Sequence, residues 1–227
     1  MRNSGVYLDP EPFEKGDPAK GRYSLLHDNY MSCGIPYKLW ANEWVNPVLR
    51  EGLGAGASTD TISDRTGKNA DMPYAMNAFT TVEGVEVVNF NCLKCHGAHF
   101  NGEFILGLGT TASDFTEARG EGTGSISSSL LEAMGLNEAE QAEYYKLTQR
   151  GSVIGPETVM RTVGNNPAEA LAIILMLHHD RNTLEWSDEP LMELVVKDAD
   201  GSLIETPVMT SDPPPWWRAH KKHALFY

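Results

Sequence analysis

The sequence predicts a mainly α-helical fold with long irregular loop elaborations, and three observations favour it. Asn137 is followed three residues later by Glu140, which is the pattern of a capping box at a helix start. Asn166 stands before Pro167, the order preferred by a helix N-cap and the first helical residue. The stretch 97–124 is rich in glycine, so we expect irregular backbone there. At 227 residues the chain is long enough to bury a sizeable core.

The amino-terminal part of the chain carries few regular helix or strand patterns. Residues 1–22 are polar and are interrupted by proline and glycine, so we expect an extended arm. A helix is predicted over 36–45, with Trp40 and Trp44 on one face because they are four residues apart. Residues 51–71 are rich in Gly, Ser, Thr and Asp, which predicts a loop.

The rest of the chain gives a clearer order of elements. Partial alternation over 84–90 predicts a short strand, and the glycine-rich stretch 97–124 predicts either close backbone approach to a flat ligand or a surface loop. Helices are predicted over 137–150, ended by the following glycine, and over 168–179, which is apolar nearly all round and so should be buried. Three prolines predict extended backbone over 212–218.

Cys92, Cys95 and His96 form the motif with the most specific chemistry. Two thiols at this spacing reach the two vinyl groups of one haem, and the next imidazole ligates the iron. A thioredoxin-like redox pair shares the cysteine spacing but prefers a βαβ context, which the flanking residues 97–102 do not suggest. A structural zinc site needs a second Cys or His pair, and the sequence has no second Cys-x-x-Cys. The motif therefore predicts one covalent haem c, with His96 as the proximal ligand.

The sequence leaves the second axial ligand of the iron open. Met160 is the first candidate, because it lies in a segment bounded by Gly and Pro just before the predicted buried helix. The alternative is that it is a plain core methionine, since the sequence has nine methionines. His179 and His178, at the end of that helix, are the imidazole alternatives, although the helix dipole alone favours histidine there. Arg161 and Arg181 are candidates to pair with haem propionates, because guanidinium binds carboxylate through two hydrogen bonds.

The net charge and the hydropathy of the sequence restrict the classes of partner and the cellular compartment that we expect. The net charge of −13 argues against nucleic acid and anionic membranes, and it suits docking to a basic redox partner. No stretch is apolar over the length of a bilayer, so we expect no transmembrane segment. Haem c is generally attached outside the cytoplasm, so we expect a periplasmic or otherwise extracytoplasmic protein whose precursor is longer than this sequence. Cys33 is expected to be a buried small hydrophobic residue, with an intermolecular disulfide or a reactive thiol as alternatives.

Beyond the motif, several stretches resemble the amino-terminal haem region of di-haem cytochromes in the cytochrome c peroxidase-like superfamily. They combine glycines with aromatic residues around the motif and near the end of the sequence, at 84–102, 107–109, 114–115 and 213–227. The resemblance covers 70–120 and 205–227. It implies a cytochrome c-like haem domain, in relatives that carry a second Cys-x-x-Cys-His downstream. This sequence has no second motif, so the resemblance implies either half of a split system or a stand-alone carrier.

These observations together predict a c-type haem domain over 71–185. Residues 1–70 are expected to be an amino-terminal arm and elaboration packed on it, and 186–227 an extended tail. The function that we expect is one-electron transfer by a single-haem cytochrome, whose partner is a redox protein, with another haem-bearing chain as one candidate. The alternatives are a haem peroxidase or oxygenase with an open distal site, and a haem-bearing structural subunit of a larger complex.

Overall fold

The computed structural model describes residues 16–47, 49, 60–110, 114–117, 126–193, 199–202 and 216. The described residues are about 39% helix and about 14% strand, and the strands form two small antiparallel sheets. The fold is therefore mixed α/β, and the expectation of a mainly α-helical fold is wrong. Strand pairing depends on partners far apart in sequence, and short strands such as these leave little local periodicity to detect.

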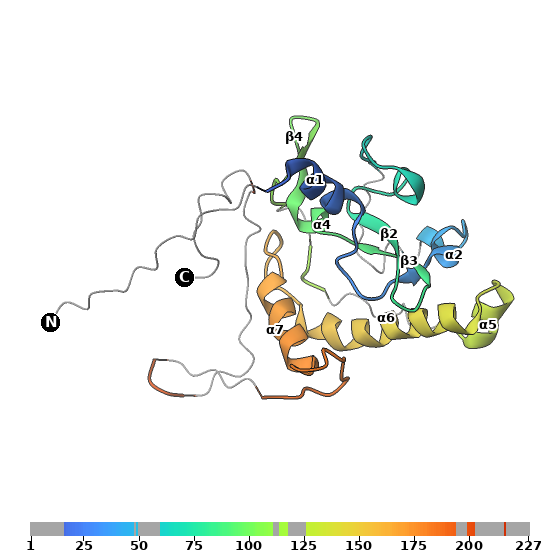
Figure 1. The fold of residues 1–227 in the computed structure, drawn as a ribbon. Helices are drawn as coiled ribbons and strands as arrows, with labels where there is room; N and C mark the ends of the chain where they lie inside the picture. Colours follow the sequence, from blue (N-terminus) through green and yellow to red (C-terminus); the bar gives the residue numbers. More distant parts are fainter. Residues whose placement is uncertain are drawn as a thin grey trace.

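The elements follow one another in a mixed order along the chain (Figure 1). The helices are α1 (Pro18–His27), α2 (Tyr37–Trp40), the 3₁₀ helix η1 (Gly67–Asn69), α4 (Leu93–His96), α5 (Ser128–Ala133), α6 (Glu138–Glu157) and α7 (Ala168–His178). The strands are β1 (Ile35–Pro36), β2 (Met76–Thr80), β3 (Glu86–Phe90), β4 (Gly97–Phe100) and β5 (Glu103–Leu106). The strand predicted over 84–90 is confirmed as β3.

β3 is the centre of the larger sheet, which has the order β1-β3-β2 and antiparallel pairing throughout. Val88 pairs with Ile35 on one side and with Ala78 on the other. The long helix α6 packs against β1, below the sheet in Figure 1. Apolar side chains from the sheet, α2, α5 and α6 form the main core, namely Ile35, Leu39, Trp40, Leu49, Met72, Met76, Ala78, Val88, Leu131, Leu136 and Tyr144. This core fixes β3, and β3 leads directly into the cysteine motif.

The capping box predicted at Asn137 is confirmed, but the helix that it opens is longer than expected. Asn137 Oδ1 accepts from the Glu140 N–H, and Glu140 Oε2 accepts from the Asn137 N–H, each at 2.9 Å. Gly151 does not end the helix, which continues to Glu157. An interior glycine costs a helix only about 1 kcal/mol, and contacts of α6 with β1 and α7 offset that cost.

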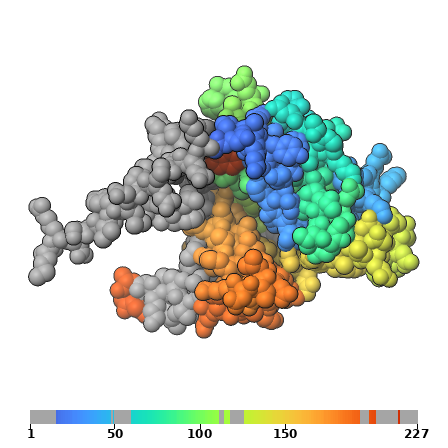
Figure 2. All heavy atoms as spheres, in the orientation of Figure 1, coloured from blue at the N-terminus to red at the C-terminus, as the bar shows by residue number. Residues whose placement is uncertain are grey.

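α7 has the expected position but not the expected burial. Its start uses Asn166, whose Oδ1 accepts from the Ala168 N–H at 2.8 Å. Of its side chains only Ile174 and His178 are buried, and Met176 is 60% exposed. Figure 2 accordingly shows α7 and the residues after it as a continuous orange surface. The expectation of burial all round is wrong, because this apolar helix borders a cavity on one side and solvent on another.

The helix predicted over 36–45 is also wrong in its extent. α2 ends at Trp40, which is 7% exposed, whereas Trp44 is 90% exposed and does not share its environment. Asn42 Oδ1 accepts from the backbone N–H groups of Trp44 and Val45, at 3.0 and 3.3 Å. Such local side-chain bonds compete with helix propagation and explain the early end.

Two regular elements replace expected irregular backbone. α1 begins after Asp17, whose Oδ1 accepts from two backbone N–H groups of the first turn, so 16–22 are not an extended arm. β4 and β5 form a hairpin within the glycine-rich stretch, turning at Asn101 and Gly102 with φ of 52° and 82°. An Asn-Gly hairpin turn requires two positive φ values in succession. The Asn-Gly dipeptide is therefore the sequence signal that could have predicted this hairpin.

Several expectations fall partly on residues that are not described. Residues 1–15 and 51–59 lie outside the described part of the chain, and 212–218 do so apart from Trp216. The division into 1–70, 71–185 and 186–227 stays a prediction. Within the described residues, none of the helices combines the length and apolar character needed to cross a membrane, which agrees with the expected lack of a transmembrane segment.

Candidate functional site

The cysteine motif forms a single helical turn, α4, directly after the central strand. Asn91 Oδ1 accepts from the Leu93 N–H at 2.8 Å, and the His96 N–H donates to the Cys92 carbonyl at 3.0 Å. Leu93 is fully buried and anchors the turn, whereas Cys92, Cys95 and His96 are half-buried. The motif side chains are thus held on a rigid turn and remain accessible to a ligand.

A buried polar network connects this turn to the larger sheet. Asn91 Nδ2 donates to Asn77 Oδ1 at 2.7 Å, and the Arg65 guanidinium donates to the same oxygen at 2.6 Å. Arg65 also donates to the carbonyls of Pro73 and Tyr74, at 3.0 and 3.1 Å. Burial lowers the pKa of Arg65 to about 10. The buried guanidinium thus joins the loop before β2 to Asn77, which lies in β2 itself.

The other side of the turn rests on the β4–β5 hairpin. Backbone N–H groups of Gly107 and Thr110 donate to the carbonyls of His96 and Cys95, at 2.8 and 2.9 Å. The Trp216 N–H donates to the Gly107 carbonyl at 2.9 Å, and the Trp216 ring stacks on the His96 ring with centroids 4.9 Å apart. These bonds satisfy the carbonyl groups at the end of α4 and fix the position of the imidazole.

Both motif cysteines are free thiols. Burial raises the pKa of Cys92 and also that of Cys95 above the usual range. The strands that flank α4, β3 and β4, belong to different antiparallel sheets. A thioredoxin-type pair has a thiol of lowered pKa on a βαβ scaffold, so the geometry does not favour that alternative.

A cavity of about 450 Å³ lies between β3, α4, α6 and α7. Lys94, between the two motif cysteines, lines it, and so does Phe90 at the end of β3. α6 and α7 contribute apolar side chains to the opposite walls, including Tyr144, Leu147, Ile154, Leu171 and Leu175. A mostly apolar cavity of this volume is typical of sites that bury a cofactor or another organic ligand.

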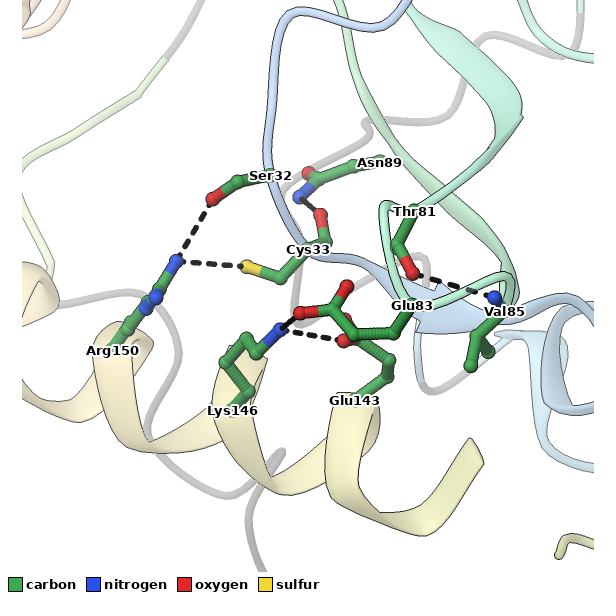
Figure 3. Close-up of polar contacts among 9 residues, drawn as sticks. All are labelled: Ser32, Cys33, Thr81, Glu83, Val85, Asn89, Glu143, Lys146 and Arg150. Atoms are coloured by element: carbon green, nitrogen blue, oxygen red, sulfur yellow. Dashed lines mark hydrogen bonds and ion pairs between the residues drawn. The ribbon is translucent and has the colours of Figure 1, made fainter. Parts of the chain in front are cut away.

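Arg150 brings a positive charge to this apolar cavity. Its guanidinium donates to Ser32 Oγ at 2.9 Å and to Cys33 Sγ at 3.8 Å (Figure 3). It also lies over the Trp186 ring, 5.4 Å from the ring centroid. Its Nε is buried without a hydrogen-bond partner, and no carboxylate of the described residues lies within ion-pair distance. Cys33 is 3% exposed, which confirms its expected burial.

The sequence did not identify Arg150 as a candidate binding residue, because the helix was predicted to end at this position. It pointed instead to Arg161 and Arg181, which are both exposed. Arg181 donates to Met192 Sδ at 3.5 Å, and neither arginine lines the cavity that the described residues form. The continuation of α6 past Gly151 is what places Arg150 within the wall.

The three candidates for the second axial position lie in different surroundings. Met160 is 3% exposed, and its backbone N–H donates to the Phe115 carbonyl at 2.7 Å. His178 is 7% exposed and stacks on Trp186. His179 lines the cavity together with Lys94 and Arg150. Met160 and His178 are not among the described residues that line it, and neither are the motif residues Cys92, Cys95 and His96.

Comparisons of the chain with protein-family models, curated proteins and solved structures found no match. Among the described residues, no group of three or more His, Cys, Asp or Glu side chains is arranged to hold a metal ion. A haem iron does not need such a group, because the porphyrin supplies four of its ligands and the protein supplies the axial ones.

The described residues fit a haem in three respects. Two free thiols stand at the spacing of the vinyl groups, with an imidazole next to them. An apolar cavity reaches the same helical turn at Lys94. Arg150 supplies a guanidinium whose Nε lacks a partner, which suits a ligand that carries carboxylates on an otherwise apolar frame.

Proposed function

We propose that this chain is a c-type cytochrome that holds one haem covalently and transfers single electrons. Cys92 and Cys95 form the thioethers, and His96 is the proximal iron ligand. The observation that carries the proposal is the motif on one helical turn, where two free thiols and an imidazole are half-buried and the backbone is held by hydrogen bonds from both sides. Lys94 of the same turn also reaches an apolar cavity, although Cys92, Cys95 and His96 are not among the described residues that line it.

Different residues of the chain are proposed to attach the haem, to bind its iron and to pair with its carboxylates. Each cysteine adds its S–H across one vinyl group, so a C–S bond forms without net oxidation. His96 is oriented by the bonds at its own backbone and by stacking on Trp216. Arg150 is available to pair with a propionate carboxylate at the far wall. Once bound, haem supplies the one-electron iron couple.

Burial and charge suit an electron carrier. Cys92 and Cys95 are half-buried, so a haem edge held by them would be within reach of a docked partner. The net charge of −13 favours a redox partner with a basic surface, and another haem-bearing chain is one candidate. Covalent attachment of haem places the protein outside the cytoplasm, in the periplasm or an equivalent compartment.

The attachment is tested by producing the chain together with a haem c maturation system. We expect the purified protein to carry one haem, detected as an added mass that survives denaturation and as a Soret band. A variant with both Cys92→Ala and Cys95→Ala should lose the added mass. Cys33→Ala is the matched control, because Cys33 is a free thiol with no place in the motif, and it should keep it.

Two outcomes would contradict the proposal. A wild-type protein without covalent haem, or a double variant that keeps it, would overturn the attachment. Rapid binding of carbon monoxide by the reduced protein would indicate an open iron position, and would favour the peroxidase or oxygenase alternative over a carrier.

A further inference from the structure

The apolar cavity beside α6 and α7 is a site of its own, apart from the residues that would attach haem. Of the cysteine turn only Lys94 lines it, and Cys92, Cys95 and His96 are not among the described residues that do. The motif therefore assigns no occupant to this space. Its volume of about 450 Å³ lies within the range of roughly 300–1,000 Å³ that is usual for sites enclosing small organic ligands.

The faces of α6 and α7 that border the cavity are apolar and incompletely covered. Leu147 and Ile154 lie on α6, and Leu171 and Leu175 lie on α7, at spacings that place each pair on one side of its helix. All four side chains are only half-buried, because one side of each borders the cavity. An apolar ligand would remove this remaining surface from water, which is favourable.

Gly151 keeps the α6 side of the cavity open. It lies in the interior of α6, and a Cβ built on it would meet nothing within 4 Å. Almost any other side chain would favour the helix more than glycine does, so helix formation gives no reason for a glycine at this position. The missing side chain instead enlarges the cavity that Gly151 lines.

Arg150 contributes a positive charge to the cavity and has no ionic partner among the described residues. Its contacts there are neutral groups, namely the Ser32 hydroxyl, the Cys33 thiol and the Trp186 ring. Its Nε is buried and lacks a hydrogen-bond partner. Glu117 also lines the cavity, but it is exposed and forms no ion pair with Arg150. A guanidinium in such surroundings suits a ligand that brings a carboxylate, which it can bind through two hydrogen bonds.

We propose that this cavity binds an organic carboxylate with an apolar chain, whose carboxylate pairs with Arg150 while its chain lies along α6 and α7. With His179 neutral, the charged residues of the described lining are two cations, Arg150 and Lys94, and one anion, Glu117, which leaves one net positive charge. A carboxylate matches that charge better than a phosphate monoester, which carries about −1.5 to −2 at neutral pH. The inference goes beyond the proposed function, because it concerns a molecule other than haem and does not depend on haem attachment.

Calorimetric titration of the haem-loaded protein with decanoate and with decanol tests the charge separately from the apolar cavity. The two probes have the same chain, and only decanoate carries a carboxylate, so the wild type should bind decanoate more tightly. Arg150→Met should weaken decanoate binding about 10- to 100-fold, as expected for the loss of a hydrogen bond between charged groups, and should leave decanol binding unchanged. Arg161→Met is the control, because Arg161 is exposed and outside the described lining, and it should change neither.

Gly151→Leu tests the cavity without removing its charge. The new side chain enters open space and favours the helix, so the variant should stay folded while binding of both probes is lost. Gly21→Leu is the matched control. Gly21 lies within α1, where a Cβ likewise meets nothing within 4 Å, and it is not among the described residues that line the cavity. This variant should bind both probes as the wild type does.

The inference is overturned by a wild type that binds neither probe, or by decanoate binding that persists unchanged in Arg150→Met or in Gly151→Leu. A wild type that binds decanol as tightly as decanoate also overturns it, and this is the result expected if a haem propionate already occupies Arg150. If Arg150→Met folds poorly and loses decanol as well, the wild-type preference and the Gly151→Leu variant decide. A chain without covalent haem that still binds decanoate through Arg150 would overturn the proposed function and leave this inference standing.

Discussion

Asn91 donates a hydrogen bond of 2.7 Å to Asn77, and so ties the cysteine turn to strand β2. The same amide oxygen of Asn77 accepts from Arg65, and the amide oxygen of Asn91 caps the turn at Leu93. Both asparagines are buried. A buried polar network stabilises a fold only while each of its groups keeps its hydrogen-bond partners. Replacing one member should therefore lower the free energy of unfolding measurably.

Asn91→Ala should destabilise the protein by about 2–3 kcal/mol, because it removes three hydrogen bonds and leaves the Leu93 N–H buried without a partner. Urea unfolding measures the effect. Asn29→Ala is the control, since Asn29 is exposed and makes a single long bond of 3.4 Å, and it should change stability by less than about 0.5 kcal/mol. Equal effects would show that the network is not what holds the turn.

Gly107 and Gly102 form a matched pair of substitution sites, which together test how closely Trp216 approaches Gly107. Their φ angles are nearly equal, at 81° and 82°. A Cβ at Gly107 would lie 2.9 Å from the Trp216 Cβ, whereas one at Gly102 would meet nothing within 4 Å. Gly102→Ala should therefore cost only the backbone strain, about 1–2 kcal/mol, and Gly107→Ala about 1–3 kcal/mol more.

Thermal unfolding of both glycine variants measures the difference between them. Trp216→Gly in the Gly107→Ala background should recover part of the extra loss, because it removes the Trp216 Cβ and ring that the new methyl group would meet while leaving the backbone strain. No recovery in this double variant would mean that Trp216 does not approach Gly107 as closely as its backbone bond to that residue implies.

What the sequence predicted correctly is mainly what short-range hydrogen bonds determine. The capping box at Asn137 and the bond from the Ala168 N–H to Asn166 Oδ1 each span only a few residues, so they were visible in the sequence. The N-cap of α7 is nevertheless Pro167, one residue later than predicted. The Asp17-Pro18 and Asn101-Gly102 pairs were equally local and were missed because they lie within stretches that looked irregular as a whole.

The cavity, by contrast, could not be predicted from local patterns. Arg150 reaches Ser32 across 118 residues of sequence, and Arg65 is positioned by strands that pair only in the folded protein. α7 is apolar all round, and nothing in its sequence distinguishes a helix in a core from one that borders a ligand cavity. The motif residues were singled out by their spacing alone, whereas the sequence leaves the second axial ligand open between Met160, His179 and His178.

Lys146 stabilises a buried carboxylate, and its removal should be costly. Its ammonium contacts Glu143, which is 2% exposed, at 2.6 Å, and Glu83 at 3.0 Å (Figure 3). Lys146→Met should destabilise the protein by about 2–4 kcal/mol, because it leaves the Glu143 charge buried without its partner. Lys38→Met, at the exposed pair with Glu140, should cost less than about 1 kcal/mol.

Unfolding in urea distinguishes the loss of a buried partner from a general effect of the lysine. Adding Glu143→Gln to Lys146→Met removes the unpaired charge and should restore part of the stability. A double variant as unstable as, or less stable than, Lys146→Met would show that the aliphatic part of Lys146, rather than its charge, is what the fold requires.

Cys33 should make the protein less stable as the solution becomes alkaline. Burial raises the pKa of the Cys33 thiol above its usual 9.0, an effect that the Arg150 charge opposes and the Glu143 charge reinforces. Below pH 9 both states keep the proton; above it the unfolded state loses its proton first, so the free energy of unfolding falls as the pH rises toward the folded pKa. The slope contributed by one thiol is at most about 1.4 kcal/mol per pH unit.

Urea unfolding at about pH 8 and about pH 10 measures how much stability is lost on going to alkaline solution. This loss should be smaller in Cys33→Ala than in the wild type. Part of it should remain in Cys33→Ala, because burial also raises the pKa of tyrosines such as Tyr144. An identical loss in both proteins would mean that the Cys33 thiol ionises as readily in the folded protein as in the unfolded chain.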